Sequence, residues 1–242
     1  MEFAIIAAGD GSRLQSEGLS VAKPLADING RPMIGRLLDI MGQCGADTVR
    51  VVVNGHSPEV AQWLLVSKDK PGVELKVKTT PDSMHTFAEA TEGFTESFIV
   101  TTVDTIFSPS ALKDALAAFE ADPDADGYMG VTDYIDDEKP LYVTTDSAGR
   151  ITAFLDSEPD GGATYVSAGI YILRPSALAT LRRCLADGTS RMRNFQRALL
   201  SDSLRLKAWP MGKVIDVDHL SDLATACELD NLFNTETNSL PS

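Results

Sequence analysis

The chain has 242 residues, 43 % hydrophobic and 23 % charged, a composition typical of a globular protein large enough to need no disulfide or structural metal. Its formal net charge of −14 argues against nucleic acid or an anionic membrane as a partner, because both require a basic face. No run approaches the roughly 18 apolar residues of a membrane span, and the spacing of the three cysteines fits no zinc or disulfide framework, so we expect a cytoplasmic protein in a reducing compartment.

Short apolar runs alternate with helix-like segments up to about residue 122. The predicted strands are Phe3–Ala7, Val49–Val53, Val73–Val77 and Phe98–Val103. The predicted helices, with Ser57 and Ser108 as N-caps of the second and fourth, are Pro32–Cys44, Pro58–Ser67, Met84–Phe94 and Pro109–Phe119. This alternation predicts βαβ units and a parallel sheet, which binds ligands beyond the carboxyl ends of its strands.

The second half has a different rhythm, in which strands follow one another before helices return. The predicted strands are Gly127–Asp133, Leu141–Thr145, Arg150–Phe154, Tyr165–Leu173, Leu204–Trp209 and the short run Val214–Val217. The predicted helices are Pro175–Leu185, Met192–Leu200 and a last one from Ser221 to about Phe233. We expect an α+β half that extends the first sheet, followed by a frayed polar tail over 235–242.

Two glycines and two cations follow the first predicted strand. Gly9 and Gly11 allow a sharp backbone turn whose N–H groups can bind phosphate oxygens, and Arg13 adds a forked cation. Lys23 precedes a proline, which favours extended backbone at the preceding residues. The loop lacks the third glycine and the immediate helix of a dinucleotide fingerprint, and it lacks the lysine of a P-loop. A loop with merely solvated cations is the alternative.

Three segments taken together resemble the opening of a known family. They are Ala7-Ala8-Gly9-x-Gly11-x-Arg13-Leu14, Lys23-Pro24-Leu25 and Asn29-Gly30-Arg31-Pro32-Met33-Ile34. This order is similar to that of nucleotidyltransferases with a GT-A-like, Rossmann-type fold, which include sugar-1-phosphate nucleotidylyltransferases and phosphocholine cytidylyltransferases. The resemblance implies that Arg13 holds the β and γ phosphates and Lys23 the α phosphate, as the catalytic cations. It also implies a nucleotide lined by Ala8, Gly9, Gly11 and Ser12, the last standing where many members have threonine.

Two aspartates match the metal motifs of that family. Asp104 ends an apolar strand, where a parallel sheet presents its ligands, and an N-cap or turn role is the alternative. The segment from Val214 to Leu223 resembles the second motif, with Asp216 in the ligand position. The resemblance implies that Asp104 and Asp216 hold Mg²⁺, a cation that takes oxygen ligands. Asp218 and Asp222 suit a turn and a helix start instead, and His219 suits a turn.

The base and the acceptor are less clearly marked. The loop from Thr79 to Thr86 stands where the family reads the base, and Ser83, His85 and Thr86 either contact it or cap the next helix. On the acceptor side the resemblance implies Gly169 and Glu158, although Ser157-Glu158 replaces the usual Glu-Lys pair. Lys213 is the candidate substitute cation, and a solvated lysine is the alternative.

These expectations combine into one catalytic domain, 1–234, with a nucleotide-binding half (1–122) and an acceptor-binding half (123–234). The expected activity is Mg²⁺-dependent transfer of a nucleotidyl group from a nucleoside triphosphate to a sugar 1-phosphate, releasing pyrophosphate by direct in-line displacement. Phosphocholine, another phosphorylated alcohol or molybdopterin as the acceptor is one alternative. A nucleotide-binding regulator without turnover is another. Whether the chain forms a homo-oligomer stays open.

Overall fold

The computed structural model describes residues 1–67, 71–135, 139–161 and 165–238, and a nine-stranded mixed sheet forms its centre. The strand order is β10-β9-β11-β6-β1-β4-β5, with β8 beside β11 and β12 beside β8. The strands are β1 (Glu2–Ala7), β4 (Thr48–Val53), β5 (Gly72–Val77), β6 (Phe98–Thr102), β8 (Gly127–Thr132), β9 (Tyr142–Thr145), β10 (Ile151–Leu155), β11 (Tyr165–Leu173) and β12 (Leu206–Pro210).

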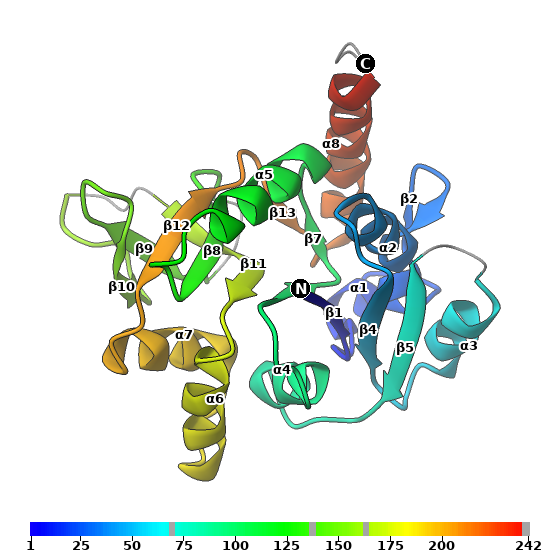
Figure 1. Cartoon of the computed structure of the whole chain (residues 1–242). Helices are drawn as coiled ribbons and strands as arrows, with labels where there is room; N and C mark the ends of the chain where they lie inside the picture. The colour runs from blue at the N-terminus through cyan, green and yellow to red at the C-terminus, as the bar shows by residue number, and fades with distance from the viewer. Residues whose placement is uncertain (68–70, 136–138, 162–164, 239–242) are drawn as a thin grey trace.

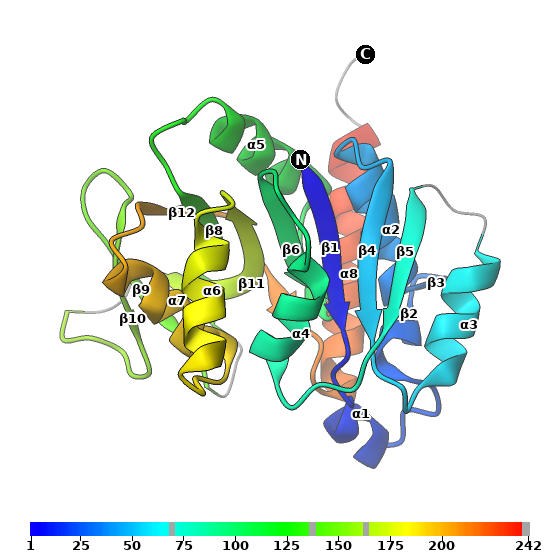
Figure 2. The same ribbon diagram turned by 60° about the horizontal axis from the view of Figure 1, so that its bottom comes forward.

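Strand direction separates the two halves of this sheet. The strands of the first half, β6, β1, β4 and β5, pair in parallel, and Figure 2 shows them side by side. In the second half β11 runs antiparallel to β6, β8 and β9, while β12 pairs in parallel with β8. The predicted Rossmann-like α/β fold, with a second half that extends the first sheet, is therefore confirmed.

Helices cover both faces of the sheet. One face packs against α2 (Met33–Gln43), α3 (Pro58–Val66) and α5 (Pro109–Glu120), and the other against α4 (Ser83–Thr91), α6 (Ala177–Ala186) and α7 (Met192–Ser201). Each helix turns an apolar stripe at helical spacing toward the strands, which is why all six follow the predicted ranges closely. None of the described helices is long and apolar enough to cross a membrane.

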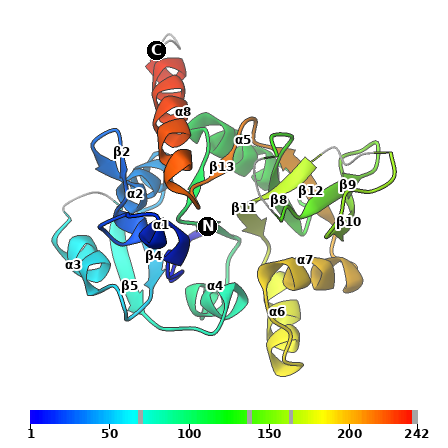
Figure 3. The ribbon, with the colours of Figure 1, turned by 180° about the vertical axis from the view of Figure 1, so that it is seen from behind.

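A third, smaller cluster joins the two ends of the chain. It contains α1 (Ser12–Ser16), the 3-10 turn η1 (Lys23–Leu25), the hairpin β2 (Asp27–Ile28)–β3 (Arg31–Pro32), the pair β7 (Thr105–Ile106)–β13 (Ile215–Asp216) and α8 (Leu220–Asn238). Buried Arg36 on α2 bonds Asp230 on α8 at 2.6 Å and donates to the carbonyl of Phe107. Figures 1 and 3 place α8 at the opposite end of the molecule from α6.

Four local expectations need correction. A five-residue helix, α1, does follow the glycine loop directly, contrary to the prediction. Ala22 is extended (φ −62°, ψ 142°), but Lys23 already belongs to a 3-10 turn. Ser57 and Ser108 occupy the predicted N-cap positions, yet in the described structure neither side chain makes the capping hydrogen bond. Finally, α8 continues through Asn238, so the predicted tail is helical at its start, and 239–242 lie outside the described residues.

Candidate active site

The glycine loop lies at the carboxyl end of β1 and packs against Lys23. Gly11 has φ +61°, a conformation that L side chains rarely adopt, and a Cβ there would lie 2.7 Å from Cβ of Lys23. Glycine at this position therefore lets the stem of Lys23 lie against the loop. As a result the Lys23 ammonium reaches the strand end where the phosphates of a nucleotide are expected.

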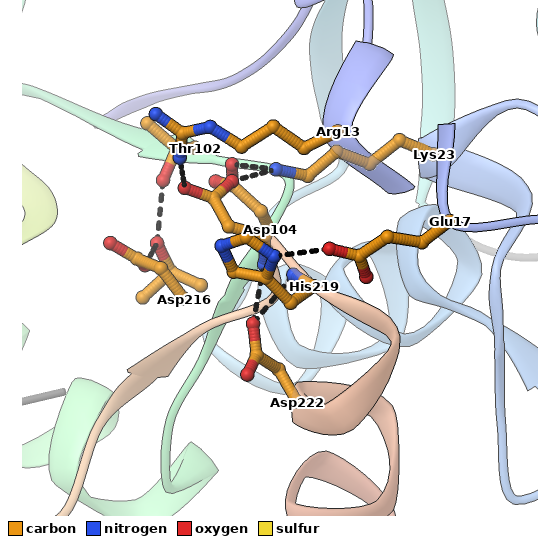
Figure 4. Close-up of polar contacts among 10 residues, drawn as sticks. Arg13, Glu17, Lys23, Thr102, Asp104, Asp216, His219 and Asp222 are labelled. Atoms are coloured by element: carbon orange, nitrogen blue, oxygen red, sulfur yellow. Dashed lines mark hydrogen bonds and ion pairs between the residues drawn. The ribbon is translucent and has the colours of Figure 1, made fainter. Parts of the chain in front are cut away.

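Lys23 joins two carboxylates that are far apart in the sequence. Its Nζ lies 2.6 Å from Oδ2 of Asp104 and 2.7 Å from Oδ1 of Asp218, and the lysine side chain is only 9 % exposed. Arg13 bonds the other oxygen of Asp218 at 2.8 Å. Figure 4 shows both cations extending toward these carboxylates. Burial disfavours the charged lysine, but Asp104 and Asp218 outweigh it and raise the pKa of Lys23, which stays cationic.

The small pair β7–β13 brings the second aspartate motif to the first. Asp216 pairs with Thr105 in register, and the N–H of Val217 donates to the carbonyl of Asp104 at 3.0 Å. The hydroxyl of Thr105 donates to Asp216 at 2.9 Å. Although a cavity leaves Asp216 accessible, the surrounding protein and then the charge of Asp104 raise its pKa to about 7. The negative charge of Asp104 therefore disfavours ionisation of Asp216 at the same strand end.

A cavity of about 360 Å³ opens on the nucleotide side of Asp104. Its lining contains most of the predicted nucleotide-binding residues, namely Ala8, Gly9, Gly11, Lys23, Ser83 and Thr86, together with Asp10, Thr79, Thr80 and Asp82. Ser12 and Arg13 are not among the lining residues, and Arg13 instead lines a small cavity of about 60 Å³ beside Asp216 and Asp218. The helix cap at α4 is Asp82, whose carboxylate accepts from the N–H groups of Met84 and His85. Ser83 and Thr86 are therefore not needed as caps.

A second cavity, of about 400 Å³, lies on the other side of Asp104 and shares Ser83, Thr102 and Asp104 with the first. Asp216 and the predicted Gly169 line it. Gly169 has φ +67°, and a Cβ there would lie 2.7 Å from Oγ1 of Thr102. Glycine is thus required where β11 passes the strand end that carries Asp104.

Two predicted acceptor-binding residues lie elsewhere. Glu158 is exposed in the segment after β10 and lines neither cavity, and Lys213 places its Nζ 4.2 Å from the ring centre of Tyr134. Positive charge in the acceptor-side cavity comes from Arg191 and Arg193 at the start of α7, and from Lys139. The cationic side chains at this cavity therefore do not come from the segment that matches the family's Glu-Lys pair.

Arg191 has an uncommon backbone conformation. With φ +69° and ψ 139° it is one of three described non-glycine residues at positive φ, and its side chain is exposed at the cavity. Such a conformation costs of order 1–3 kcal/mol and persists where the surroundings hold it. Nothing in the local sequence predicts this strain or a site role for Arg191, and Asp218, predicted as a turn residue, instead bonds Lys23 and Arg13.

Asp104 and Asp216, the two aspartates of the predicted metal motifs, lie together at this strand end. No group of three or more His, Cys, Asp and Glu side chains in 1–67, 71–135, 139–161 and 165–238 is arranged to hold a metal. Two adjacent carboxylates are sufficient for Mg²⁺, which keeps several waters and binds substrate phosphates. The surrounding protein and then repulsion from Asp104 raise the pKa of Asp216, and a bound cation would relieve that repulsion.

Comparisons with known proteins agree with this arrangement. The model of the MobA-like NTP transferase domain matches residues 3–202, which includes Asp104 but ends before Asp216. Mannose-1-phosphate guanylyltransferase 1 of Arabidopsis thaliana is 28 % identical over 187 residues, 74 % of this chain and 51 % of that protein. A mannose-1-phosphate guanylyltransferase catalytic subunit beta of Drosophila melanogaster is 27 % identical over 180 residues, 72 % of this chain and 48 % of its own. The chain thus spans about half the length of these curated relatives.

Solved structures share the fold over nearly the whole chain. The inositol-1-phosphate CTP transferase from T. maritima gives a TM-score of 0.78 at 20 % identity, covering 96 % of this chain and 95 % of that one. A putative glucose-1-phosphate thymidylyltransferase from Bacillus anthracis gives 0.81 at 18 % identity, covering 95 % and 94 %. The resemblance predicted from the opening motifs is confirmed, and this chain belongs to the family of MobA-like NTP transferase domains.

Proposed function

We propose that this protein transfers a nucleotidyl group from a nucleoside triphosphate to a sugar 1-phosphate, with Mg²⁺, and releases pyrophosphate. The observation that carries the proposal is the position of Asp104, which lines both cavities and bonds Lys23 at 2.6 Å. A reaction that joins two phosphorylated substrates needs two adjoining sites with a charged group at their junction.

The chemistry needs no strong base. An oxygen of the acceptor phosphate, already ionised, attacks the α phosphorus, and the bond from that phosphorus to the β-phosphate oxygen breaks as pyrophosphate leaves. Lys23 neutralises charge on the α phosphate, and Arg13 turns from Asp218 to the β and γ phosphates. Bound at Asp104 and Asp216, Mg²⁺ would add charge neutralisation at the same phosphates.

The Arabidopsis and Drosophila relatives support a sugar phosphate as the acceptor, since both are named mannose-1-phosphate guanylyltransferases. The lining of the second cavity supports a phosphorylated acceptor more generally, because Arg191 offers a planar fork suited to phosphate, whereas Arg193 already bonds Asp156. The three described cysteines are unpaired, which suits the reducing cytoplasm as the site of reaction.

The test is a pyrophosphate-release screen of four nucleoside triphosphates against sugar 1-phosphates, with Mg²⁺ present and then removed by chelation. We expect release with one triphosphate and acceptor pair, and loss of that release in Asp104→Asn or with chelator. Silence across the panel would overturn the proposal, and if triphosphate still stabilised the protein it would favour a regulator without turnover.

A second acceptor class, a phosphorylated alcohol or a phosphonate, has its own support. The Glu-Lys pair typical of sugar enzymes is absent, and the residue in its place, Glu158, lies outside the cavity. One structural neighbour is named an inositol-1-phosphate CTP transferase, and a CMP-5'-(3-aminopropyl)phosphonate synthase of Streptomyces rubellomurinus is 28 % identical over 157 residues, 56 % of this chain and 24 % of that protein. Release that depends on phosphocholine or an inositol phosphate, but on no sugar 1-phosphate, would select this class.

A further inference from the structure

The short helix α1 is attached to the start of α8 at both of its ends. At its beginning, Arg13 bonds Asp218 at 2.8 Å. Just after its last residue, Glu17 lies with one carboxylate oxygen 2.5 Å from Nδ1 of His219, and its other oxygen accepts from the N–H of Leu220 at 2.7 Å. Residues about 200 positions apart in the sequence are thereby joined twice.

The segment that receives these contacts is itself fixed in place. Asp222, in the first turn of α8, accepts from the N–H groups of Asp218 at 2.9 Å and His219 at 2.7 Å. Together with Glu17 it satisfies three backbone donors at the start of α8, where a helix leaves such groups without partners. Figure 4 shows Glu17 and Asp222 both directed toward the segment at His219.

The two attachments of α1 differ in what substrate binding does to them. Under the proposed function, the Arg13 guanidinium must leave Asp218 to bind phosphate oxygens, so the first attachment breaks in every turnover. The contacts of Glu17 involve neither Arg13 nor Lys23, and Glu17 lines neither of the two large cavities. This second attachment therefore persists when the nucleotide enters.

We propose that Glu17 is a positioning residue whose carboxylate holds α1 against the start of α8, so that Arg13 reaches the nucleotide phosphates from a fixed helix. The inference rests on the proposed function, since it assigns Arg13 to the phosphates. The bond to His219, and then the N–H of Leu220, keep the pKa of Glu17 below its ordinary value, so the carboxylate is ionised at neutral pH.

The kinetic test compares Glu17→Ala with Glu17→Gln and with Glu92→Ala. Glu92 is the matched control. Like Glu17 it is an exposed glutamate with a charged-group partner, Lys76 at 2.6 Å, and it lines neither large cavity. For Glu17→Ala we expect KM for the triphosphate to rise about tenfold, as the loss of charge-assisted hydrogen bonds predicts. KM for the acceptor should change less than about twofold, because no residue of α1 lines that cavity. Glu17→Gln should recover most of the loss, since its amide oxygen can still accept from Leu220.

A purely structural helix cap would lower stability and leave this KM difference absent. A folded Glu17→Ala variant with an unchanged KM for the triphosphate, or with equal rises for both substrates, would therefore overturn the inference.

Hydrogen exchange tests the same residue without turnover. In Glu17→Ala the amides of Leu220 and of α1 should exchange faster than in the wild type, and unchanged exchange would contradict the role of Glu17. If the wild type releases no pyrophosphate, the proposed function fails while this measurement still decides on Glu17.

Discussion

The two cavities that meet at Asp104 are built in different ways. The nucleotide side is lined by loop backbone and small side chains at the carboxyl ends of parallel strands, with Lys23 already paired to carboxylates. The acceptor side is lined by long side chains from α7 and from the antiparallel part of the sheet, with arginines at the cavity. Backbone N–H groups suit a triphosphate, which every nucleotide shares, whereas side chains can change from one acceptor to the next. Under the proposed function, this difference assigns the choice of acceptor to the second cavity and the binding of the triphosphate common to all nucleotide substrates to the first.

The residue common to both cavities should give the largest effect. Asp104→Asn removes the charge that Lys23 and a divalent cation share, so we expect kcat to fall about 10³-fold, the loss of several kcal/mol of transition-state stabilisation. Pyrophosphate release measures the fall, and Asp114→Asn, on the exposed side of α5, is the matched control. If Asp104→Asn keeps a kcat within tenfold of the wild type, Asp104 has no essential role in the reaction at the junction of the two cavities.

The glycines should show that both cavities need close backbone approach. Gly11→Ala and Gly169→Ala each place a Cβ 2.7 Å from a neighbouring atom at positive φ, and we expect each to lower the free energy of unfolding by about 2–4 kcal/mol. Gly149→Ala has a similar φ, +75°, but open space around it, so about 1 kcal/mol is expected. Denaturant unfolding measures all three, and an equal loss in all three would argue against the close approach.

Arg191 should separate the two sides. Arg191→Ala is expected to raise KM for the acceptor about 10- to 100-fold, since a charge-assisted hydrogen bond contributes about 1.5–3 kcal/mol, and to leave KM for the triphosphate unchanged. Arg191→Gly should raise the unfolding free energy by about 1 kcal/mol by relieving the positive φ, while still weakening acceptor binding. Arg205→Ala, exposed at the start of β12 and remote from the cavity, is the control. A rise in KM for the triphosphate alone would assign Arg191 to the nucleotide side.

Asp82 should give the smallest effect, a loss of stability at neutral pH that disappears at low pH. Burial opposes ionisation of Asp82, but the bond to His85 and the backbone N–H groups of His85, Met84 and Arg191 outweigh it and hold its pKa below the ordinary value. Because the folded pKa is depressed, this stabilisation is present above the unfolded pKa near 4 and is lost as the pH falls through the folded pKa. Asp82→Asn keeps a good N-cap, so it should cost about 1 kcal/mol or less at pH 7 and nothing near pH 2. Chemical denaturation at both pH values measures this, and an equal loss at both would exclude the charge as its cause.

The sequence predicted the nucleotide side well because its signals are local. The glycines, Lys23 and Asp104 each follow a recognisable strand or precede a proline, and the fold brings them to one strand end. The bounds of the helices and strands could also be predicted, since the spacing of apolar residues that defines each element lies within a short stretch of sequence. The predicted roles of these residues in binding and catalysis stay predictions.

The acceptor side was less predictable because its lining depends on packing. Arg191 lies at the cavity because α7 packs against the sheet, and the sequence around Arg191 does not show where that helix packs. Glu158 and Lys213 were selected by analogy with a motif that this chain lacks. Asp218 was assigned to a turn because its partners, Lys23 and Arg13, are 195 and 205 positions away.

The pairing of β7 with β13 also sets an order of events during synthesis. Thr105 and Asp216 are 111 positions apart, and the ribosome releases the strands of the parallel sheet well before β13. Until then Lys23 lacks its second carboxylate partner, Asp218, and has Asp104 alone of the pair. A growing chain can thus form its parallel strands and the whole lining of the first cavity, which ends at Asp104, before Asp218 joins Lys23 and Asp216 joins Thr105.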